Sequence, residues 1–389
     1  MKILFSAVGY PTKHHPFSAF IAMMAEEFAK KGHEVTVIAP QSVTRSILRR
    51  CPLLPLYEKV EVTGGIFPIK IYRPKSFTMG EGKIRGNFTF YFNRRAVEKC
   101  LDKIDEKYDV AYAHFWAAAY YVFRYTITNN IPLVVVSGED KITMHKYITG
   151  TTLSELRNKI YKVIGVSSKN IKESISLGLA TSKNSVIIPN GPDLRIFHPY
   201  NKREMRHKFK IEDDKFVIAF TGRFVYRKGA KRVEDAILSL KDEKIGAFFI
   251  GSAMKDEDAA QEPMGKEILY KGILDHTELP KWLSMADVFV LPTLAEGCSN
   301  AIVEAMGCGL PIISSDRDFN HDILNKENAF LVNPLDIEDI AAKIKVLKNN
   351  SQLVEEMGKA SLEKAKEISF EKRSLKILMI LEEAIKDRM

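Results

Sequence analysis

Apolar and polar residues alternate along this chain in a way that predicts strands and helices in turn. Residues 2–8 (KILFSAV) form an apolar run that is typical of a buried strand. From Ser18 to Lys31 the apolar residues recur at helical spacing, and Gly32 follows as a helix-ending residue. Residues 34–40 (EVTVIAP) predict a second strand. This strand–helix–strand order is the building unit of a parallel sheet.

The same alternation continues along the chain in two series. The first series adds strands at 109–114, 132–138, 163–167 and 185–191, with helices at 116–128 and 168–177. The second series has strands at 215–223, 246–251, 267–272, 287–292, 311–316 and 329–334, with helices at 230–240, 278–285, 299–307 and within 336–364. They meet at residues 189–203, a stretch rich in Pro and Asn that is typical of a domain linker.

Two series of this kind predict an α/β protein with two Rossmann-like, doubly wound domains and a cleft between them. We expect the N-terminal domain at residues 1–190 and the C-terminal domain at 191–370. Ligands of such folds bind beyond the carboxyl ends of the strands, so functional residues are expected in the loops that follow each strand.

The composition excludes several classes of protein. The 389 residues are 46% apolar and 28% charged, and suffice for about two or three domains. No apolar run approaches the ~18–20 residues that a membrane span needs. The four cysteines, at 51, 100, 298 and 308, show neither a CxxC pair nor metal-ligand spacing, which predicts reduced thiols in a cytoplasmic protein. A membrane-spanning protein, a disulfide scaffold and a zinc ribbon are therefore not expected.

The net charge of +9 is spread unevenly along the chain. Residues 1–200 hold 28 Lys and Arg against 16 Asp and Glu, whereas residues 201–389 hold 30 against 33. The first half therefore carries all the excess positive charge. Such a surface attracts phosphates, anionic lipid or nucleic acid.

Two segments of this basic half interrupt the alternation of strands and helices. Residues 45–57 (RSILRRCPLLPLY) mix three Arg with Leu, Ile and two Pro, and residues 73–95 hold six basic residues and one acid, Glu81. Several aromatic residues lie among the latter: Phe77, Phe88, Phe90, Tyr91 and Phe92. Either these segments are loops and a helix whose aromatic residues belong to the core, or they form a surface that docks on an anionic membrane or grips a long acceptor.

The richest candidate chemistry lies in residues 291–316 (LPTLAEGCSNAIVEAMGCGLPIISSD). A strand ends at Pro292, a loop carries Glu296, and a helix that begins near Ser299 bears Glu304 in its second turn. The unpaired N–H groups of such a helix start make an anion site. Two carboxylates on either side of it suit the hydroxyls of a sugar–diphosphate–ribose ligand. The alternative is that Glu296 caps the helix and Glu304 is a solvated helix residue.

A second candidate follows the first strand of the second series, in residues 220–230 (FTGRFVYRKGA). Gly222 ends the strand, Arg223 follows, and Lys228 precedes a helix. Two cations at the carboxyl end of a strand can clamp a diphosphate leaving group. The alternative, ordinary surface charge at a helix start, is less favourable because cations there oppose the helix dipole.

These motifs together resemble the GT-B glycosyltransferases and are similar to family 4 of the retaining enzymes. The matching pieces occur in order over nearly the whole chain: GHEVTVIAP (32–40), DVAYAH (109–114), GVS (165–167), IIPNGPDLRIF (187–197), TGRFVYRKG (221–229) and ADVFVLPTLAEGCSNAIVEAMGCGLPII (286–313). The last piece is highly specific in combination. The resemblance implies a GT-B fold whose last helix, at about 371–387, crosses back to the N-terminal domain.

The resemblance also implies roles for individual residues. Arg223 and Lys228 would bind the donor diphosphate, and Glu304 the ribose. Glu296 and the N–H groups of 298–301 would hold the donor sugar, and His114 would contact it. Further donor-binding residues would be Gly222, Cys298, Ser299, Asn300, Ala301, Gly272 and Leu274. The acceptor would meet Pro16, Phe17 and Asp140.

Three features depart from the family's pattern. Residues 137–140 read SGED where HGSD is common, and the usual Gly-x-Gly after FFIG is absent at 251–253. After Pro311, residues 318–324 (DFNHDIL) replace a pattern of the Gly-Gly-Glu type. These differences concern the identity of the substrates more than the class of reaction.

By resemblance, the reaction is a retaining, metal-independent hexosyl transfer from a UDP- or GDP-sugar to a saccharide, lipid-linked or phosphorylated acceptor, with no other cofactor. The leaving phosphate takes the acceptor's proton on the same face. The basic half predicts a cytoplasmic protein that associates peripherally with a membrane, and no nucleic acid is expected. Two alternatives are a sugar-nucleotide epimerase of the same fold and a non-catalytic protein that binds anionic surfaces.

Overall fold

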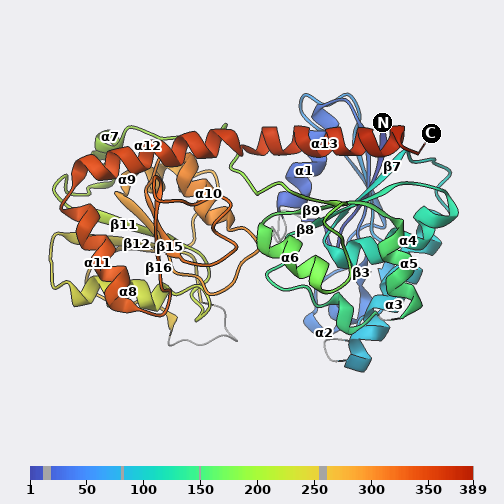
Figure 1. Ribbon diagram of the computed structural model, residues 1–389, viewed down its shortest axis with the longest axis horizontal. Coiled ribbons are helices and arrows are strands. Elements are labelled where there is room, and N and C mark those ends of the chain that lie inside the picture. The colour runs from blue at the N-terminus through green and yellow to red at the C-terminus, as the bar shows by residue number, and fades with distance from the viewer. Residues whose placement is uncertain (12–18, 80–82, 149, 254–260, 389) are drawn as a thin grey trace. The chain divides into compact units, whose positions relative to one another are not determined.

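The computed structural model divides the chain into two units (Figure 1). The first contains Met1–Ile188 and Ser374–Met389, and the second contains Pro189–Arg373. Helix α13 (Phe370–Lys386) begins in the second unit and continues into the first. The structure describes residues 1–11, 19–79, 83–148, 150–253 and 261–388.

The first unit is built on an eight-stranded sheet in its described part, in the order β10-β9-β8-β7-β1-β2-β5-β4. Neighbouring strands run parallel except for β4, which pairs antiparallel to β5 at the edge. The strands are β1 (Lys2–Ser6), β2 (Glu34–Ile38), β4 (Tyr57–Val60), β5 (Ile69–Tyr72), β7 (Val110–His114), β8 (Leu133–Ser137), β9 (Ile160–Gly165) and β10 (Ser185–Ile187). A short ribbon pairs β3 (Gln41–Ser42) with β6 (Lys75–Ser76).

Helices connect and cover the strands of this unit. They are α1 (Ala19–Lys30), α2 (Val43–Arg49), α3 (Lys83–Leu101), α4 (Trp116–Thr128), α5 (Thr151–Lys159), α6 (Ser168–Ser176) and the 3-10 turn η1 (Met144–Lys146). Helix α4 is almost wholly apolar, and its side chains Trp116, Val122 and Phe123 are fully buried. It packs into the main core cluster with Leu133 and Val135 of β8.

The second unit has a six-stranded sheet in its described part, in the order β13-β12-β11-β14-β15-β16, and every neighbouring pair is parallel. The strands are β11 (Phe216–Thr221), β12 (Ile245–Ile250), β13 (Ile268–Gly272), β14 (Val288–Leu291), β15 (Ile312–Ser315) and β16 (Ala329–Val332). The helices are α7 (Lys202–Phe209), α8 (Ala230–Ser239), α9 (Leu279–Met285), α10 (Asn300–Gly307), α11 (Ile337–Lys348) and α12 (Ser351–Glu367).

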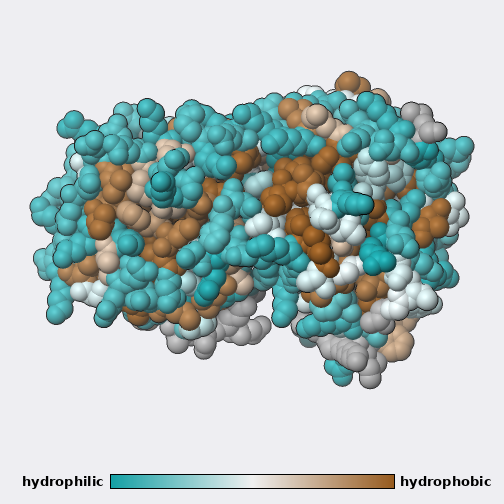
Figure 2. All heavy atoms as spheres, viewed as in Figure 1, coloured by the Kyte–Doolittle hydropathy of each residue, from teal (hydrophilic) through white to brown (hydrophobic). Residues whose placement is uncertain are grey.

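The strands β11, β12 and β14 are buried along their whole length, as expected of a parallel sheet covered on both faces. The surface helix α12 instead buries one stripe, which includes Met357 and Ala365. Along the upper edge of Figure 2, where α12 runs in Figure 1, the exposed residues are mainly hydrophilic. Within the described ranges, no helix combines the length and the apolar character that a membrane span requires.

The predicted fold class is confirmed, and the predicted strands and helices of the second series are present. The prediction missed the β3–β6 ribbon, α2, β4 and β5, whereas α3 corresponds to the helix that one alternative placed in residues 73–95. The interpretation of residues 45–57 and 73–95 as loops with a helix of core aromatics is only partly correct. Phe90 packs against the core, but Phe77, Phe88 and Tyr91 are exposed.

Candidate functional site

Three glycines line the carboxyl edge of the second unit's sheet. Gly222, Gly251 and Gly272 follow or end the neighbouring strands β11, β12 and β13. Their backbones are in direct contact, because the N–H of Gly251 donates to the carbonyl of Gly272 over 2.8 Å. A Cβ on Gly251 would lie 1.9 Å from the carbonyl oxygen of Gly222. The close approach of these strand ends therefore requires glycine at position 251.

The loop that carries Arg223 and Lys228 is fixed by a buried arginine. Arg232, in the first turn of α8, donates from Nη1 to the carbonyl of Tyr226 over 2.8 Å and from Nη2 to that of Pro292 over 2.9 Å. Gly229 turns the chain into α8 with a φ of +83°, and a Cβ there would meet Nη2 of Arg232 at 2.6 Å. Arg223 is exposed at the start of this loop.

Lys228 forms an ion pair with Glu296, so the two candidate loops meet through their charged residues. Glu296 also accepts a hydrogen bond from the Thr293 hydroxyl over 3.1 Å, and Nη1 of Arg227 lies 3.6 Å from its Oε1. The Glu296 side chain is only 12% exposed. Ser299, not Glu296, occupies the N-cap position of α10. The alternative interpretation of Glu296 as a helix cap is therefore wrong.

The start of α10 is held in place without a side-chain cap. The Ser299 side chain makes no capping hydrogen bond to the helix. Asn190 instead anchors the loop, because its Nδ2 donates to the Cys298 carbonyl over 3.1 Å and to Oδ1 of Asn300 over 2.9 Å. Burial raises the pKa of the Cys298 thiol to about 12. Cys298 can therefore contribute its backbone to an anion site but not a thiolate.

Glu304, one turn further along α10, is paired with a histidine. Its Oε1 lies 3.0 Å from Nε2 of His276, which belongs to the loop between β13 and α9. The hydrogen bond to Glu304 raises the pKa of His276, and burial opposes this effect. The Glu304 side chain is 16% exposed, so the alternative interpretation of it as a solvated helix residue is wrong. Gly272 and the half-buried Leu274 belong to the same segment as His276.

The second unit therefore collects cations, carboxylates and uncapped helix amides at one sheet edge. Arg223, Lys228, Glu296 and Glu304 all follow strands at the carboxyl end, where ligands of such folds bind. The arrangement can hold a diphosphate between positive groups and accept hydrogen bonds from hydroxyls through its carboxylates. Among the residues that the structure describes, no group of three or more His, Cys, Asp or Glu is placed to hold a metal ion.

In the first unit, His114 lies at the carboxyl end of β7 among aromatic rings. Its ring centre is 4.9 Å from that of Phe20 and 4.7 Å from that of Phe115, and its Nδ1 lies 3.2 Å from the Tyr112 hydroxyl. The imidazole is buried. The end of β7 thus orients His114 firmly, beside the strained residue Phe115, whose φ is +80°.

Glu139 secures the turn that follows His114. Its carboxylate accepts hydrogen bonds from the N–H of Trp116, the first residue of α4, over 2.8 Å and from the N–H of Gly138 over 2.9 Å. Burial raises the pKa of Glu139, and these hydrogen bonds oppose the shift. The neighbouring Asp140 is exposed, and its carbonyl accepts from Lys169. The predicted acceptor residues Pro16 and Phe17 lie outside the described residues.

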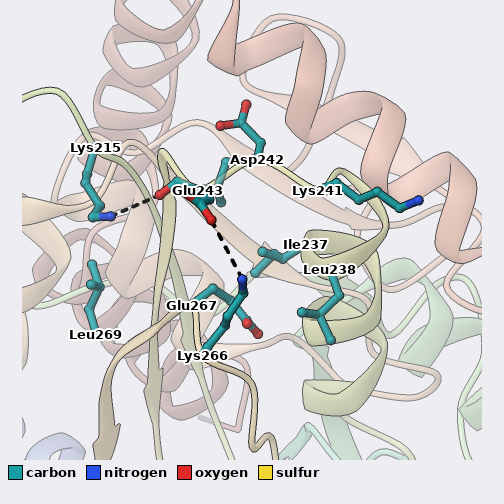
Figure 3. A pocket seen from close by; sticks show the side chains of 10 residues that line it. Lys215, Ile237, Leu238, Lys241, Asp242, Glu243, Lys266, Glu267 and Leu269 are labelled. Carbon is teal, nitrogen blue, oxygen red and sulfur yellow. Dashed lines mark hydrogen bonds and ion pairs between the residues drawn. The ribbon is translucent and has the colours of Figure 1, made fainter.

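The second unit also has a hollow of about 530 Å³ at the opposite edge of its sheet (Figure 3). Its lining includes Lys215 and Ile245, next to or at the amino ends of β11 and β12, and the ion pair of Lys266 with Glu243. The predicted donor residues do not line this hollow. The hollow is therefore separate from the carboxyl-edge site.

Sequence reasoning missed the roles of Asn190, Arg232 and His276. Asn190 belongs to the IIPNG piece and Arg232 follows the Lys228 loop, so their place in the sequence beside these motifs is a signal that could have found both. Their partners lie 60 to 110 residues away, because Arg232 bonds Pro292 and Asn190 bonds Asn300. Contacts between residues so far apart in the sequence form only when the chain folds, so no local sequence pattern indicates them.

Two family models match the chain, one in each half. The model described as Glycosyltransferase Family 4 matches residues 18–195, and the model described as Glycosyl transferases group 1 matches residues 201–364. The second model covers the second series of strands and helices, and the first covers its own series except the first strand, β1.

Proteins of similar sequence align with different shares of this chain. TuaC of Bacillus subtilis, named as a teichuronic acid biosynthesis glycosyltransferase, is 25% identical over 361 residues, 88% of each chain. An Escherichia coli enzyme named UDP-Gal:alpha-D-GlcNAc-diphosphoundecaprenol alpha-1,3-galactosyltransferase is 31% identical over 164 residues, 39% of this chain and 42% of that one.

Solved structures share the fold over the full length. The sucrose-phosphate synthase of Thermosynechococcus elongatus aligns with a TM-score of 0.76 at 17% identity, over 98% of both chains. HepE of Anabaena, solved with UDP and glucose, aligns with a TM-score of 0.71 at 18% identity, over 98% of this chain and 100% of that one.

Proposed function

Because the chain belongs to the GT-B glycosyltransferases of the family 4 type, we propose that it transfers a hexosyl group from a UDP- or GDP-sugar with retention and without a metal ion. One observation carries the proposal: the Lys228–Glu296 ion pair joins the two donor loops at the carboxyl edge of the second unit's sheet. This edge already holds Arg223 and the uncapped start of α10. A diphosphate and a sugar hydroxyl are the ligand groups that such a pair of opposite charges suits.

In the proposed reaction, the bond between the sugar's anomeric carbon and the β-phosphate oxygen breaks, and a bond to the acceptor oxygen forms on the same face. The acceptor's proton passes to the departing phosphate oxygen. Arg223, Lys228 and the amides of 299–301 stabilise the negative charge that develops on the diphosphate. These cations supply the positive charge that a metal ion would otherwise provide.

The carboxylates are proposed to bind the hydroxyl groups of the donor. Glu304 accepts hydrogen bonds from the ribose, and Glu296 accepts from the transferred sugar. Gly222, Gly272 and Leu274 border the nucleotide, and Cys298 contributes through its backbone. His114 is proposed to contact the donor sugar, and Asp140, Pro16 and Phe17 the acceptor, all by resemblance to the family.

The acceptor is proposed to be a saccharide carried on a lipid or bearing a phosphate. The excess positive charge of the first 200 residues supports an anionic acceptor. The Escherichia coli relative is named for a sugar linked to diphosphoundecaprenol, an acceptor of this kind, and UDP-Gal is its named donor. We propose that the protein acts at the cytoplasmic face of a membrane.

The proposal is tested first by donor binding. UDP-, GDP- and ADP-sugars are added to the protein, and the melting temperature is followed, since a ligand that binds only the native state raises it. We expect UDP- or GDP-sugars to raise it, and Glu304→Ala to abolish most of the rise. The matched variant Glu338→Ala, an exposed glutamate of α11, should leave the rise unchanged. No shift with any nucleotide sugar would overturn the proposal.

Transfer itself is tested with the donor that binds. We expect a product whose anomeric configuration matches the donor's, formed equally well in the presence of EDTA. Conversion of the donor in the absence of any acceptor would indicate an epimerase instead. An inverted product, or activity abolished by EDTA and restored by a divalent metal, would contradict the proposed mechanism.

A further inference from the structure

The first unit carries an exposed group of large apolar side chains that the proposed sugar transfer does not use. Three of its segments contribute: α2, residues 77–79 after β6, and α3. We call this group the docking face, and its members are Ile47, Leu48, Phe77, Met79, Phe88 and Tyr91. The most exposed members are Ile47, at 72%, and Leu48, at 78%.

The three segments that carry the docking face are tied together by contacts between them. Ser42 and Ser76 pair in the β3–β6 ribbon, and the N–H of Met79 donates to the Thr89 hydroxyl over 2.9 Å. The Phe77 and Phe92 rings lie 6.5 Å apart. Figure 1 shows α2 and α3 on the same side of this unit.

On α3 the exposed residues follow helical spacing. Arg85, Phe88, Tyr91, Arg95 and Lys99 recur every three or four residues and are all exposed. The residues between them turn inward, since Asn93, Arg94 and Val97 are buried. The helix therefore presents a stripe with an aromatic centre and basic ends. Such a stripe suits an interface between water and lipid.

Positive charge surrounds the apolar members of the docking face. Arg45, Arg50, Lys75 and Arg85 are exposed on or next to the same segments, and Arg95 is exposed but pairs with Glu98 over 3.3 Å. No acidic residue occurs in α2, in residues 75–79 or from Lys83 to Val97, and Glu81 lies outside the described residues. Basic residues beside inserted apolar groups are the combination that holds a protein on an anionic bilayer.

The docking face lies at the same sheet edge as Asp140, the predicted acceptor residue that the structure describes. The β3–β6 ribbon follows the carboxyl ends of β2 and β5, and the N–H of Gln41 donates to the Pro74 carbonyl over 3.0 Å. Asp140 follows the carboxyl end of β8 in the same sheet. An acceptor held in the bilayer would therefore arrive at the edge of the unit that faces it.

We infer that the docking face seats this unit on the surface of an anionic phospholipid bilayer, with the apolar side chains in the lipid and the basic ones against the headgroups. The inference deepens the proposed function by naming the surface at which the acceptor is met. Vesicle binding needs no donor and no acceptor, so it fails or succeeds independently of sugar transfer.

The experiment measures sedimentation of the full chain with vesicles of phosphatidylcholine containing phosphatidylglycerol, without substrates. We expect strong binding that falls with added salt, and at least tenfold weaker binding to pure phosphatidylcholine. Ile47→Ser with Leu48→Ser should weaken binding about tenfold. Ile66→Ser, a control at 75% exposure outside the docking face, should leave it unchanged.

Charge is tested separately with matched pairs. Arg45→Gln with Arg85→Gln should weaken binding to the anionic vesicles at least tenfold. Lys103→Gln with Lys183→Gln removes two exposed charges of the same unit outside the docking face and should have little effect. Melting temperatures and nucleotide-induced shifts of all variants should match those of the native chain, which shows that they are folded.

Three outcomes would overturn the inference. Equal binding to neutral and anionic vesicles would exclude the electrostatic part, and equal binding by all variants would place the contact elsewhere. A native chain that is dimeric, and becomes monomeric on Ile47→Ser with Leu48→Ser, would make a second copy of this chain the occupant of the docking face.

Discussion

The carboxyl edges of the two sheets differ in the types of residue that form them. In the second unit, Gly251 allows the ends of β11 and β12 to approach closely, and charged residues such as Lys228 and Glu296 meet across neighbouring loops. In the first unit, the edge is packed with rings, and His114 lies buried between Phe20 and Phe115. The same parallel architecture therefore places paired charges at one edge and packed aromatic rings at the other.

This difference matches what each edge is proposed to bind. A nucleotide diphosphate demands charge and close backbone approach, which Lys228 and Gly222 are proposed to provide. The edge of the first unit departs from the family pattern at residues 137–140, where Glu139 takes over the support of the α4 turn. The second unit departs from the same pattern as well, at residues 251–253 and 318–324, so neither edge is free of features particular to this chain.

The sharpest test of the charged edge removes its cations. Arg223→Ala and Lys228→Ala should each lower turnover about 10²–10³-fold, because each loses a positive group that stabilises the leaving diphosphate. Steady-state kinetics with a saturating acceptor measures the effect. Lys208→Ala, an exposed lysine of α7, serves as the control and should be near normal. Near-normal turnover of both site variants would show that these cations do not stabilise the leaving diphosphate. The proposed difference in function between the two sheet edges would then fail.

Gly251→Ala tests whether the close approach of β11 and β12 at this edge requires glycine. The new Cβ would lie 1.9 Å from the Gly222 carbonyl oxygen, so the β11 and β12 loops must separate. We expect the second unit to lose about 1–3 kcal/mol of stability. The chain has two tryptophans, Trp116 in the first unit and Trp282 in the second, so unfolding of the second is followed by fluorescence in a Trp116→Phe background.

Gly222→Ala is the matched control for this steric effect. Gly222 has nearly the same φ, +150° against +152°, but a Cβ there meets nothing closer than 3.7 Å. Both variants place an alanine at nearly the same φ. They differ in the space that is available to its Cβ. Equal losses of stability would show that strain, not the close approach of the two loops, sets the requirement for glycine.

Glu139→Ala tests the packed edge of the first unit. The variant removes the acceptor for the Trp116 N–H at the start of α4, which should cost about 0.5–2 kcal/mol, as for a lost helix cap. Unfolding of the first unit is measured through Trp116 in a Trp282→Phe background. Glu155→Ala, an exposed glutamate of α5, should change little. No loss for Glu139→Ala would mean that aromatic packing alone holds the turn.

The sequence predicts the second unit better than the first for a physical reason. Its strands are short apolar runs between helices with one apolar face, and both patterns are periodic. In the first unit, β4 (YEKV) is an exposed edge strand with no apolar run, and α3 places aromatic residues on its solvent side. Patterns that assume buried apolar residues miss such elements.

For the candidate site as well, the sequence indicates some features and not others. Glu296, Glu304, Arg223 and Lys228 stand out because charged residues directly follow apolar strands or lie on the first turns of helices. Their actual partners could not be predicted, because His276 reaches Glu304 across 28 residues through a loop without periodic pattern. Sequence thus predicts which edge bears the chemistry, whereas folding alone determines which side chains pair there.

His276 gives the smallest and most specific test of the charged edge. The hydrogen bond to Glu304 raises its pKa above the ordinary value of 6.5, so the folded chain binds this proton more tightly than the unfolded chain. The resulting stability is fully present below about pH 6.5 and is lost as the pH rises through the raised pKa. Because His276 is half exposed, the pair should contribute about 0.2–1 kcal/mol.

His276→Gln keeps a hydrogen-bond donor beside Glu304 and removes the titration. Followed through Trp282, the native second unit should be more stable than this variant at pH 5.5, and the two should converge at pH 8.5. The other groups near His276 are Asp193, whose charge also raises its pKa, and the Phe197 ring at 4.9 Å. Saturating UDP should shrink the pH-dependent difference, because the ribose then takes the carboxylate. If the pH-dependent difference in stability persists with UDP bound, Glu304 pairs with His276 and does not bind the nucleotide.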